Sequence, residues 1–89
     1  MTVYVNSGSS DKTVELKAQG GDEVFMAQVQ VWVPKEGEVE AHWEDWGTAI
    51  EFSSGTAPLI TVGGGKRVIA YDVDPANNSQ DVDLDVTVS

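Results

Sequence analysis

The chain has 89 residues, no cysteine and a formal net charge of −10, from fifteen acidic and five basic side chains. At this length we expect one domain over residues 1–89 with a thin core, and without cysteine the chain has neither a disulfide nor a thiolate. The negative charge argues against direct binding of nucleic acid, because that needs cations that neutralise phosphates. It suits cations, basic partners or solubility in salt.

The first residues, "MTVYVNSGSS", lack the basic start and apolar run of a signal peptide. The apolar stretch "VFMAQVQVWVP" contains two glutamines and is too short to cross a bilayer. The sequence therefore predicts a soluble chain and leaves its compartment open.

Apolar and polar residues alternate with a period of two along most of the chain, which is typical of half-buried β-strands. In chain order the predicted strands are "TVYVN", "TVELKAQ", "EVFMAQVQVWV", "EVEAHWE", "TAIEFS", "PLITV", "KRVIAYDVD" and "DVDLDVTV". Turn-forming clusters such as "NSGSSD", "PKEG" and "DPANNSQ" separate them, and no window shows a helical period. We therefore expect an all-β fold: an antiparallel two-sheet β-sandwich of about eight short strands, immunoglobulin-like or jelly-roll.

The third and fourth predicted strands are expected to form one hairpin over residues 24–44 with a five-residue loop, 34–38. The inward side would carry Phe25, Ala27, Val29, Val31 and Val33 from one strand and Val39, Ala41 and Trp43 from the other. This register is preferred because it places apolar residues opposite apolar residues. Three outward pairs follow from it: Trp32 with Glu40, Gln30 with His42, and Gln28 with Glu44.

The outward strip of this hairpin is the candidate ligand-binding surface, formed by Gln28, Gln30, Trp32, Glu40, His42, Glu44 and, at its end, Trp46. Flat aromatic rings stack on the C–H faces of sugars while nearby polar groups bond to hydroxyls, so the strip favours a glycan ligand. In one alternative the tryptophans are packing residues covered by a loop or by the second sheet. In another, His42 is a metal ligand between two glutamates, although one imidazole and two carboxylates are a poor set for zinc.

The segment "YDVDPANNSQDVDLDV" raises a second question, because it places aspartates on both sides of a turn. If residues 68–74 pair with residues 81–88, Asp74 faces Asp81, Asp72 faces Asp83, and Ala70 faces Asp85. Like charges directly opposed in a sheet are destabilising, here by about 1–3 kcal/mol per pair before screening by salt.

Four explanations of these aspartates are open. Calcium takes oxygen ligands, and the loop offers a calcium site formed by Asp74, Asn77, Asn78 and Asp81, although the spacing is not that of an EF-hand. A basic protein partner would neutralise the carboxylates, in one version because they imitate the phosphates of nucleic acid. A high-salt habitat would screen them. In the fourth explanation, the two strands lie in different sheets and never meet.

Catalysis is not expected from this sequence. His42 is the only imidazole, and it lies in an outward row with no serine at a supporting position. Glu40 and Glu44 resemble a glycosidase pair only in residue type, since nothing in the sequence marks a cleft around them. We therefore expect no enzyme and no certain cofactor, with calcium as the candidate ion.

Two segments, "VYVNSGSSDKTVEL" and "LITVGGGKRVIAYDVD", resemble small β-sandwich defence proteins of bacteria and fungi, which include insecticidal and membrane-active types. Tyr71 stands here where many of those proteins carry tryptophan. The resemblance covers about a third of the chain and includes no catalytic motif. It implies a binding or membrane-directed role, and the acidic charge departs from most membrane-active members.

These observations favour a non-enzymatic recognition module of the defence or insecticidal toxin kind, which binds a glycan or a cell-surface protein receptor. The alternatives are an acidic inhibitor or nucleic-acid mimic that binds a basic protein partner, and a calcium-stabilised structural domain. The sequence leaves the ligand, the strand order and the oligomeric state open.

Overall fold

The computed structural model describes residues 2–19, 24–53, 55–72 and 84–89, and every regular element in these ranges is a β-strand. In chain order the strands are β1 (Thr2–Val5), β2 (Lys12–Ala18), β3 (Val24–Val33), β4 (His42–Asp45), β5 (Ile50–Ser53), β6 (Leu59–Val62), β7 (Lys66–Asp72) and β8 (Leu84–Val88). Within the same ranges there is no long apolar helix of the kind that spans a membrane. The all-β fold expected from the period-two pattern is confirmed.

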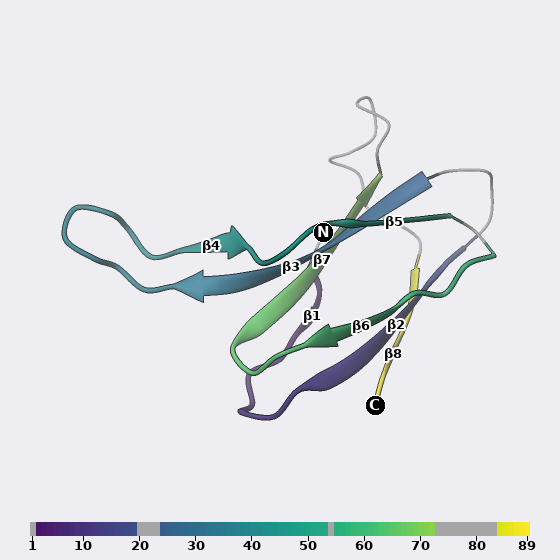
Figure 1. Ribbon diagram of the computed structural model, residues 1–89, viewed down its shortest axis with the longest axis horizontal. Coiled ribbons are helices and arrows are strands. Elements are labelled where there is room, and N and C mark those ends of the chain that lie inside the picture. Colours follow the sequence, from purple (N-terminus) through teal and green to yellow (C-terminus); the bar gives the residue numbers. More distant parts are fainter. Residues whose placement is uncertain (1, 20–23, 54, 73–83) are drawn as a thin grey trace.

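The strands form two antiparallel sheets (Figure 1). The larger sheet has the order β1-β7-β3-β4, and β5 also pairs with β3. Because β7 occupies one edge of β3, β4 and β5 share the other edge, β5 beside residues 24–27 and β4 beside residues 30–33. The smaller sheet has the order β6-β2-β8. The expected antiparallel two-sheet β-sandwich is thus the observed fold.

Of the two forms expected, the pairing of the central strands matches the immunoglobulin-like one. β2 lies beside β6 and β3 lies beside β7, as strands B and E, and strands C and F, do in that fold. The outer strands differ, because β1 lies beside β7 where strand G belongs, and β8 lies beside β2 where strand A belongs. Compared with the immunoglobulin fold, the first and last described strands, β1 and β8, have therefore exchanged sheets.

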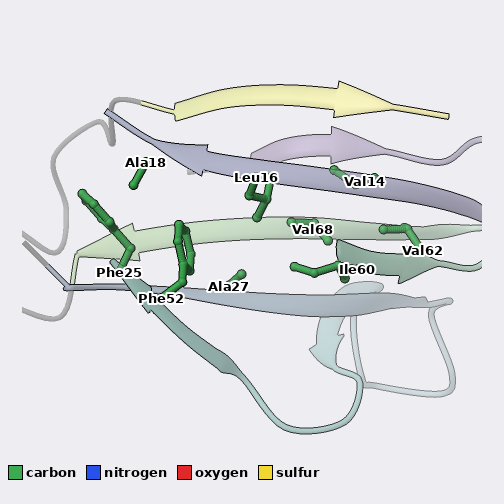
Figure 2. Packing of buried hydrophobic residues seen from close by; sticks show 9 residues of the cluster. All are labelled: Val14, Leu16, Ala18, Phe25, Ala27, Phe52, Ile60, Val62 and Val68. Atoms are coloured by element: carbon green, nitrogen blue, oxygen red, sulfur yellow. The ribbon is translucent and has the colours of Figure 1, made fainter. Parts of the chain in front are cut away.

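The core lies between the two sheets and is formed by inward residues of β2, β3, β5, β6 and β7 (Figure 2). β2 contributes Val14, Leu16 and Ala18, as its alternation predicts. From the larger sheet, Phe25 packs against Phe52 with ring centroids 5.6 Å apart. The other buried apolar members of the cluster are Ala27, Ile60, Val62 and Val68.

The inward row of β3 is covered along only part of its length. Ala27 is buried and Val29 packs against the core, but Val31 and Val33 are only half-buried. The reason is geometric, since the β3–β4 hairpin extends beyond the smaller sheet (Figure 1). The hairpin therefore has two accessible faces, and the predicted burial of Val31 and Val33 is incomplete.

Within the described residues, β7 and β8 do not pair with each other, contrary to the predicted aspartate hairpin. β7 lies between β1 and β3 in the larger sheet, whereas β8 lies beside β2 in the smaller one. Ala70 is consequently opposite Ala27, and Asp85 is opposite Lys17. The pairing was wrong because a period-two pattern fixes which residues share a face but not which sheet a strand joins. Asp74, Asn77, Asn78, Asp81 and Asp83 lie outside the described residues.

The loop after β1 and the turn before β7 are held together by the buried side chain of Asn6. Its Nδ2 donates to the carbonyl oxygens of Ser10, at 2.7 Å, and Val62, at 2.8 Å, and its Oδ1 accepts from the Gly8 amide at 3.1 Å. Gly64 passes so close that a Cβ there would lie 2.6 Å from the Gly8 carbonyl oxygen. The two segments that resemble defence proteins therefore meet at one end of the sandwich.

Candidate functional site

The candidate surface lies on the β3–β4 hairpin, whose register differs from the predicted one. The observed partners are Gln30 with Asp45, Val31 with Glu44, Trp32 with Trp43, and Val33 with His42. Nearer the tip, Glu36 and Val39 exchange two backbone hydrogen bonds of 3.0 Å, so the turn consists of Gly37 and Glu38 alone. Gly37 has a φ of 59°. The first central position of a type II′ turn requires a positive φ, which glycine readily adopts.

A two-residue turn in place of a five-residue loop exchanges the faces of β4. Gln30, expected opposite His42, instead lies opposite Asp45, and a shift by an odd number of residues reverses every side chain of the strand. Trp43 therefore lies beside Trp32 and not opposite Val29. The predicted strip is divided between the two faces of the hairpin, with Glu40, His42 and Glu44 on the side away from Trp32. The prediction failed because it matched apolar residues and did not use Gly37 as a turn signal.

One side of the hairpin, here called the outer face, is formed by Thr2, Gln30, Trp32, Trp43, Asp45 and Arg67. Trp32 and Trp43 are edge to face, with ring centroids 5.3 Å apart and ring planes at 66°. The guanidinium carbon of Arg67 lies 4.3 Å from the centroid of the Trp43 ring, within the range of a cation–π contact. Trp43 is half-buried in contact with both neighbours, whereas Trp32 remains 47% exposed. Trp32 is thus the more accessible ring of the pair.

A chain of hydrogen bonds runs across four strands beside the two rings. Arg67 Nε donates to Gln30 Oε1 at 3.0 Å, and Gln30 Nε2 donates to Asp45 Oδ1 at 3.0 Å. Arg67 Nη1 also donates to Thr2 Oγ1 at 3.3 Å. The sheet supplies this order, because Gln30 of β3 is paired with Arg67 of β7 on one side and with Asp45 of β4 on the other. Both ends of the Gln30 carboxamide are used, so its orientation is fixed.

Gln28 lies in the same row of β3 but belongs to the interior, with 5% of its surface exposed. Its Nε2 donates to the Val29 carbonyl at 2.8 Å and reaches the carbonyls of Trp46 and Gly47, each at 3.3 Å. These carbonyls lie where the chain leaves β4 on its way to β5. Gln28 therefore supplies hydrogen bonds to the backbone where the chain leaves β4. Its burial argues for this structural role and against the predicted role in ligand binding.

The other side of the hairpin, here called the inner face, carries Val31, Val33, His42, Glu44, Trp46 and Lys66. Trp46 is 57% exposed, and Lys66 Nζ lies 4.5 Å from the centroid of its ring. Trp46 and Trp32 consequently lie on opposite faces and do not form one strip. Glu40, nearer the tip, forms an ion pair of 3.6 Å with Lys35, and because both groups are well exposed it contributes little stability.

His42 has an acceptor at each ring nitrogen. Nδ1 lies 2.7 Å from the Glu40 carbonyl oxygen, and Nε2 lies 2.9 Å from Glu44 Oε1. Neither oxygen can donate when Glu44 is ionised, so both contacts become hydrogen bonds only when the ring carries two protons. The Glu40 carbonyl first, and then the Glu44 carboxylate, raise the pKa of His42 above its ordinary value of 6.5.

No metal centre is found in the part of the chain that the structure describes, where no three His, Cys, Asp or Glu side chains gather as ligands. His42 and Glu44 are a hydrogen-bonded pair there, without a third donor. The predicted calcium ligands Asp74, Asn77, Asn78 and Asp81 are outside the described residues.

Four residues of the outer face were missed by the sequence-based prediction: Thr2, Trp43, Asp45 and Arg67. Trp43 was assigned to the wrong side of β4, and the two-residue turn at Gly37 was the signal that would have corrected it. Arg67 comes from β7, and nothing local to either strand indicates that β7 lies beside β3. The surface is thus assembled from three segments that are distant in sequence.

No family model matches this chain, and neither the curated proteins nor the solved structures include one that is significantly similar to it. The fold and the geometry of the hairpin are therefore the observations from which function is argued.

Proposed function

We propose that this chain is a non-enzymatic recognition module that binds a glycan through the outer face of the β3–β4 hairpin. The defence or toxin role implied by the resemblance of two segments is part of this proposal, with the glycan as the mark on the target surface. The single observation that carries it is the Trp32–Trp43 pair, which is held by Arg67 and placed next to an ordered row of polar groups.

Such a surface has the composition that sugar recognition requires. An accessible indole covers the C–H face of a sugar ring, and fixed polar groups beside it make hydrogen bonds to hydroxyls at little entropic cost. Rings and polar groups of the outer face are already in contact with one another in the free protein. This preorganisation is what distinguishes a binding surface from scattered exposed tryptophans.

A basic protein partner remains the second candidate, supported by the net charge of −10. Its second motive, the facing of aspartates across a β7–β8 hairpin, is weakened, since the described parts of β7 and β8 lie in different sheets. The calcium-stabilised alternative concerns residues outside those described. The outer face therefore gives the glycan proposal the stronger support.

The proposal is tested by comparing Trp32→Ala with Trp46→Ala, two exposed tryptophans on opposite faces of one hairpin. The labelled wild-type protein is screened on a glycan array, and affinity for the strongest hit is measured for each variant. We expect Trp32→Ala to lower affinity by tenfold or more, roughly the loss of an interface hot spot, and Trp46→Ala to leave it unchanged. Equal effects of the two substitutions, or none, would contradict the proposal.

A further inference from the structure

Gln30 holds two opposite charges at the two ends of one carboxamide. Arg67 donates to its oxygen and Asp45 accepts from its nitrogen, each at 3.0 Å. Asp45 is exposed, and within the described residues its second oxygen, Oδ2, has no hydrogen-bond partner. Arg67 likewise has N–H groups beyond the two that it donates to Gln30 and Thr2. The outer face thus presents a fixed acceptor and a fixed donor on the two sides of Gln30.

The tryptophan pair, Trp32 and Trp43, lies two residues along the strands from the polar pair, Gln30 and Asp45. Trp32 is two residues beyond Gln30 on the same face of β3, which places the two pairs about 6.5 Å apart along the strand. Trp43 has the same relation to Asp45 on β4. A single sugar ring stacked on Trp32 therefore extends its hydroxyl-bearing edge toward the polar pair.

From this geometry we infer that the site takes neutral saccharides that carry two adjacent free hydroxyls, an inference that rests on the proposed function. One hydroxyl donates to Asp45 Oδ2 and its neighbour accepts an N–H of Arg67, while a C–H face of the ring lies on Trp32. Trp43 and Gln30 are positioning residues, because each acts by holding a group that contacts the sugar. Acidic sugars are disfavoured by electrostatics, because the carboxylate of Asp45 cannot donate to an acidic group and the chain as a whole repels anions.

Saturation-transfer NMR and titration calorimetry with three saccharide sets test the inference. The first set is neutral oligosaccharides from glucans, mannans and galactans. The second consists of singly O-methylated forms of the neutral saccharide that binds, and the third of sulfated and uronic-acid oligosaccharides. We expect binding of neutral saccharides, with saturation strongest on the C–H protons of one ring face. O-methylation at either of two adjacent positions should weaken binding about tenfold or more: at one, the O–H that donates to Asp45 is lost, and at the other, the added methyl group occupies the space of the contact with Arg67.

Asp45→Asn is the decisive variant, with Asp85→Asn as its matched control, since both remove one charge from an exposed aspartate on a strand. Asp45→Asn should weaken neutral binding about five- to tenfold, because a hydrogen bond to a charged acceptor is replaced by one to a neutral acceptor. Asp85→Asn should have no effect. Gln30→Leu alone should also weaken binding. In the double variant with Asp45→Asn, the loss of affinity should be smaller than the sum of the two single losses, because Gln30 acts through Asp45.

The outcomes separate this inference from the proposed function. If anionic saccharides bind as tightly as neutral ones through Trp32, or if Asp45→Asn leaves neutral binding unchanged, the neutral-diol inference is overturned and the glycan proposal stands. If no saccharide of any set binds to the wild-type protein, both fall.

Discussion

The two faces of the β3–β4 hairpin carry the same pair of groups, a tryptophan with a cation over its ring, and organise them differently. On the outer face, Arg67 contacts Trp43 and also donates to Gln30 and Thr2. On the inner face, Lys66 lies over Trp46, and no hydrogen bond of its ammonium to another side chain is found in the described part of the chain. The cations are consecutive residues of β7, so the pleat alone sends them to opposite faces.

The difference shows what a planar, multiply donating cation does that a point charge does not. A guanidinium can stack on an indole and still direct its in-plane N–H groups at an amide and a hydroxyl, whereas an ammonium on a flexible stem makes a weaker, less directional contact. The outer face is therefore ordered as a unit, and the inner face is a set of separate contacts. Four predictions test this contrast.

The largest effect should come from truncating the tryptophan that the outer network holds. We expect Trp43→Ala to lower the free energy of unfolding by about 2–3 kcal/mol, somewhat less than for a fully buried ring because Trp43 is half-buried. Trp46→Ala, which removes an exposed ring, should cost about 1 kcal/mol or less. Urea unfolding of both variants measures the difference, and equal losses would show that the outer face is no better ordered than the inner one.

Gln28 joins the two faces, because its amide satisfies the carbonyl of Trp46 from the opposite side of the sheet. Gln28→Leu keeps the side-chain size but removes the amide that donates to the carbonyls of Val29, Trp46 and Gly47, and we expect a loss of about 1–2 kcal/mol. Gln28→Glu should cost more, because a carboxylate next to carbonyl oxygens cannot donate unless it takes up a proton. Thermal unfolding tests both, and a neutral Gln28→Leu substitution would refute this role.

The third prediction concerns the two cations, each of which is replaced by the other residue type. Arg67→Lys should cost about 1 kcal/mol, because the hydrogen bond from Nε to Gln30 is lost with the guanidinium fork. It should also weaken the exciton coupling of Trp32 and Trp43 in the far-ultraviolet circular dichroism spectrum. Lys66→Arg, the converse change on the inner face, should shift stability by no more than about 0.5 kcal/mol and leave the exciton signal intact. A larger effect from Lys66→Arg would reverse the comparison.

The smallest effect concerns protons on the inner face. Because the pKa of His42 is raised in the folded state, its contribution to stability is fully present below the ordinary value of 6.5 and is lost as the pH rises through the folded pKa. The melting temperature of the wild-type protein relative to His42→Gln should therefore fall from pH 5.5 toward pH 8, a range set by that direction of shift. Proton NMR of the imidazole gives the pKa directly. A value at or below 6.5 would contradict the geometry.

The fold was predictable from sequence to the extent that it depends on local alternation. Val14, Leu16, Ala18 and Phe25 are buried as the period-two pattern requires. Two features could not be predicted from local alternation. The sheet that β8 joins depends on contacts between residues distant in sequence, and the register of the β3–β4 hairpin depends on the backbone conformation of Gly37. The prediction of the candidate site was affected most. Trp32 and Gln30 were correctly placed on one side of β3, but the residues of β4 expected beside them all lie on the other face.

The strand order also has a consequence for how the molecule assembles. β3 and β4 are neighbours in the sequence, whereas β1 pairs with β7, and β2 pairs with β6 and β8. Local hairpins close in about 1–10 μs, but sandwiches dominated by distant pairings fold in about milliseconds to seconds, because long loops must close before their contacts form. We therefore expect the β3–β4 hairpin to appear early, with Trp32 already beside Trp43. Arg67 reaches Trp43 only when β7 docks, so the surface proposed to recognise sugar acquires its final order in the same step that closes the larger sheet.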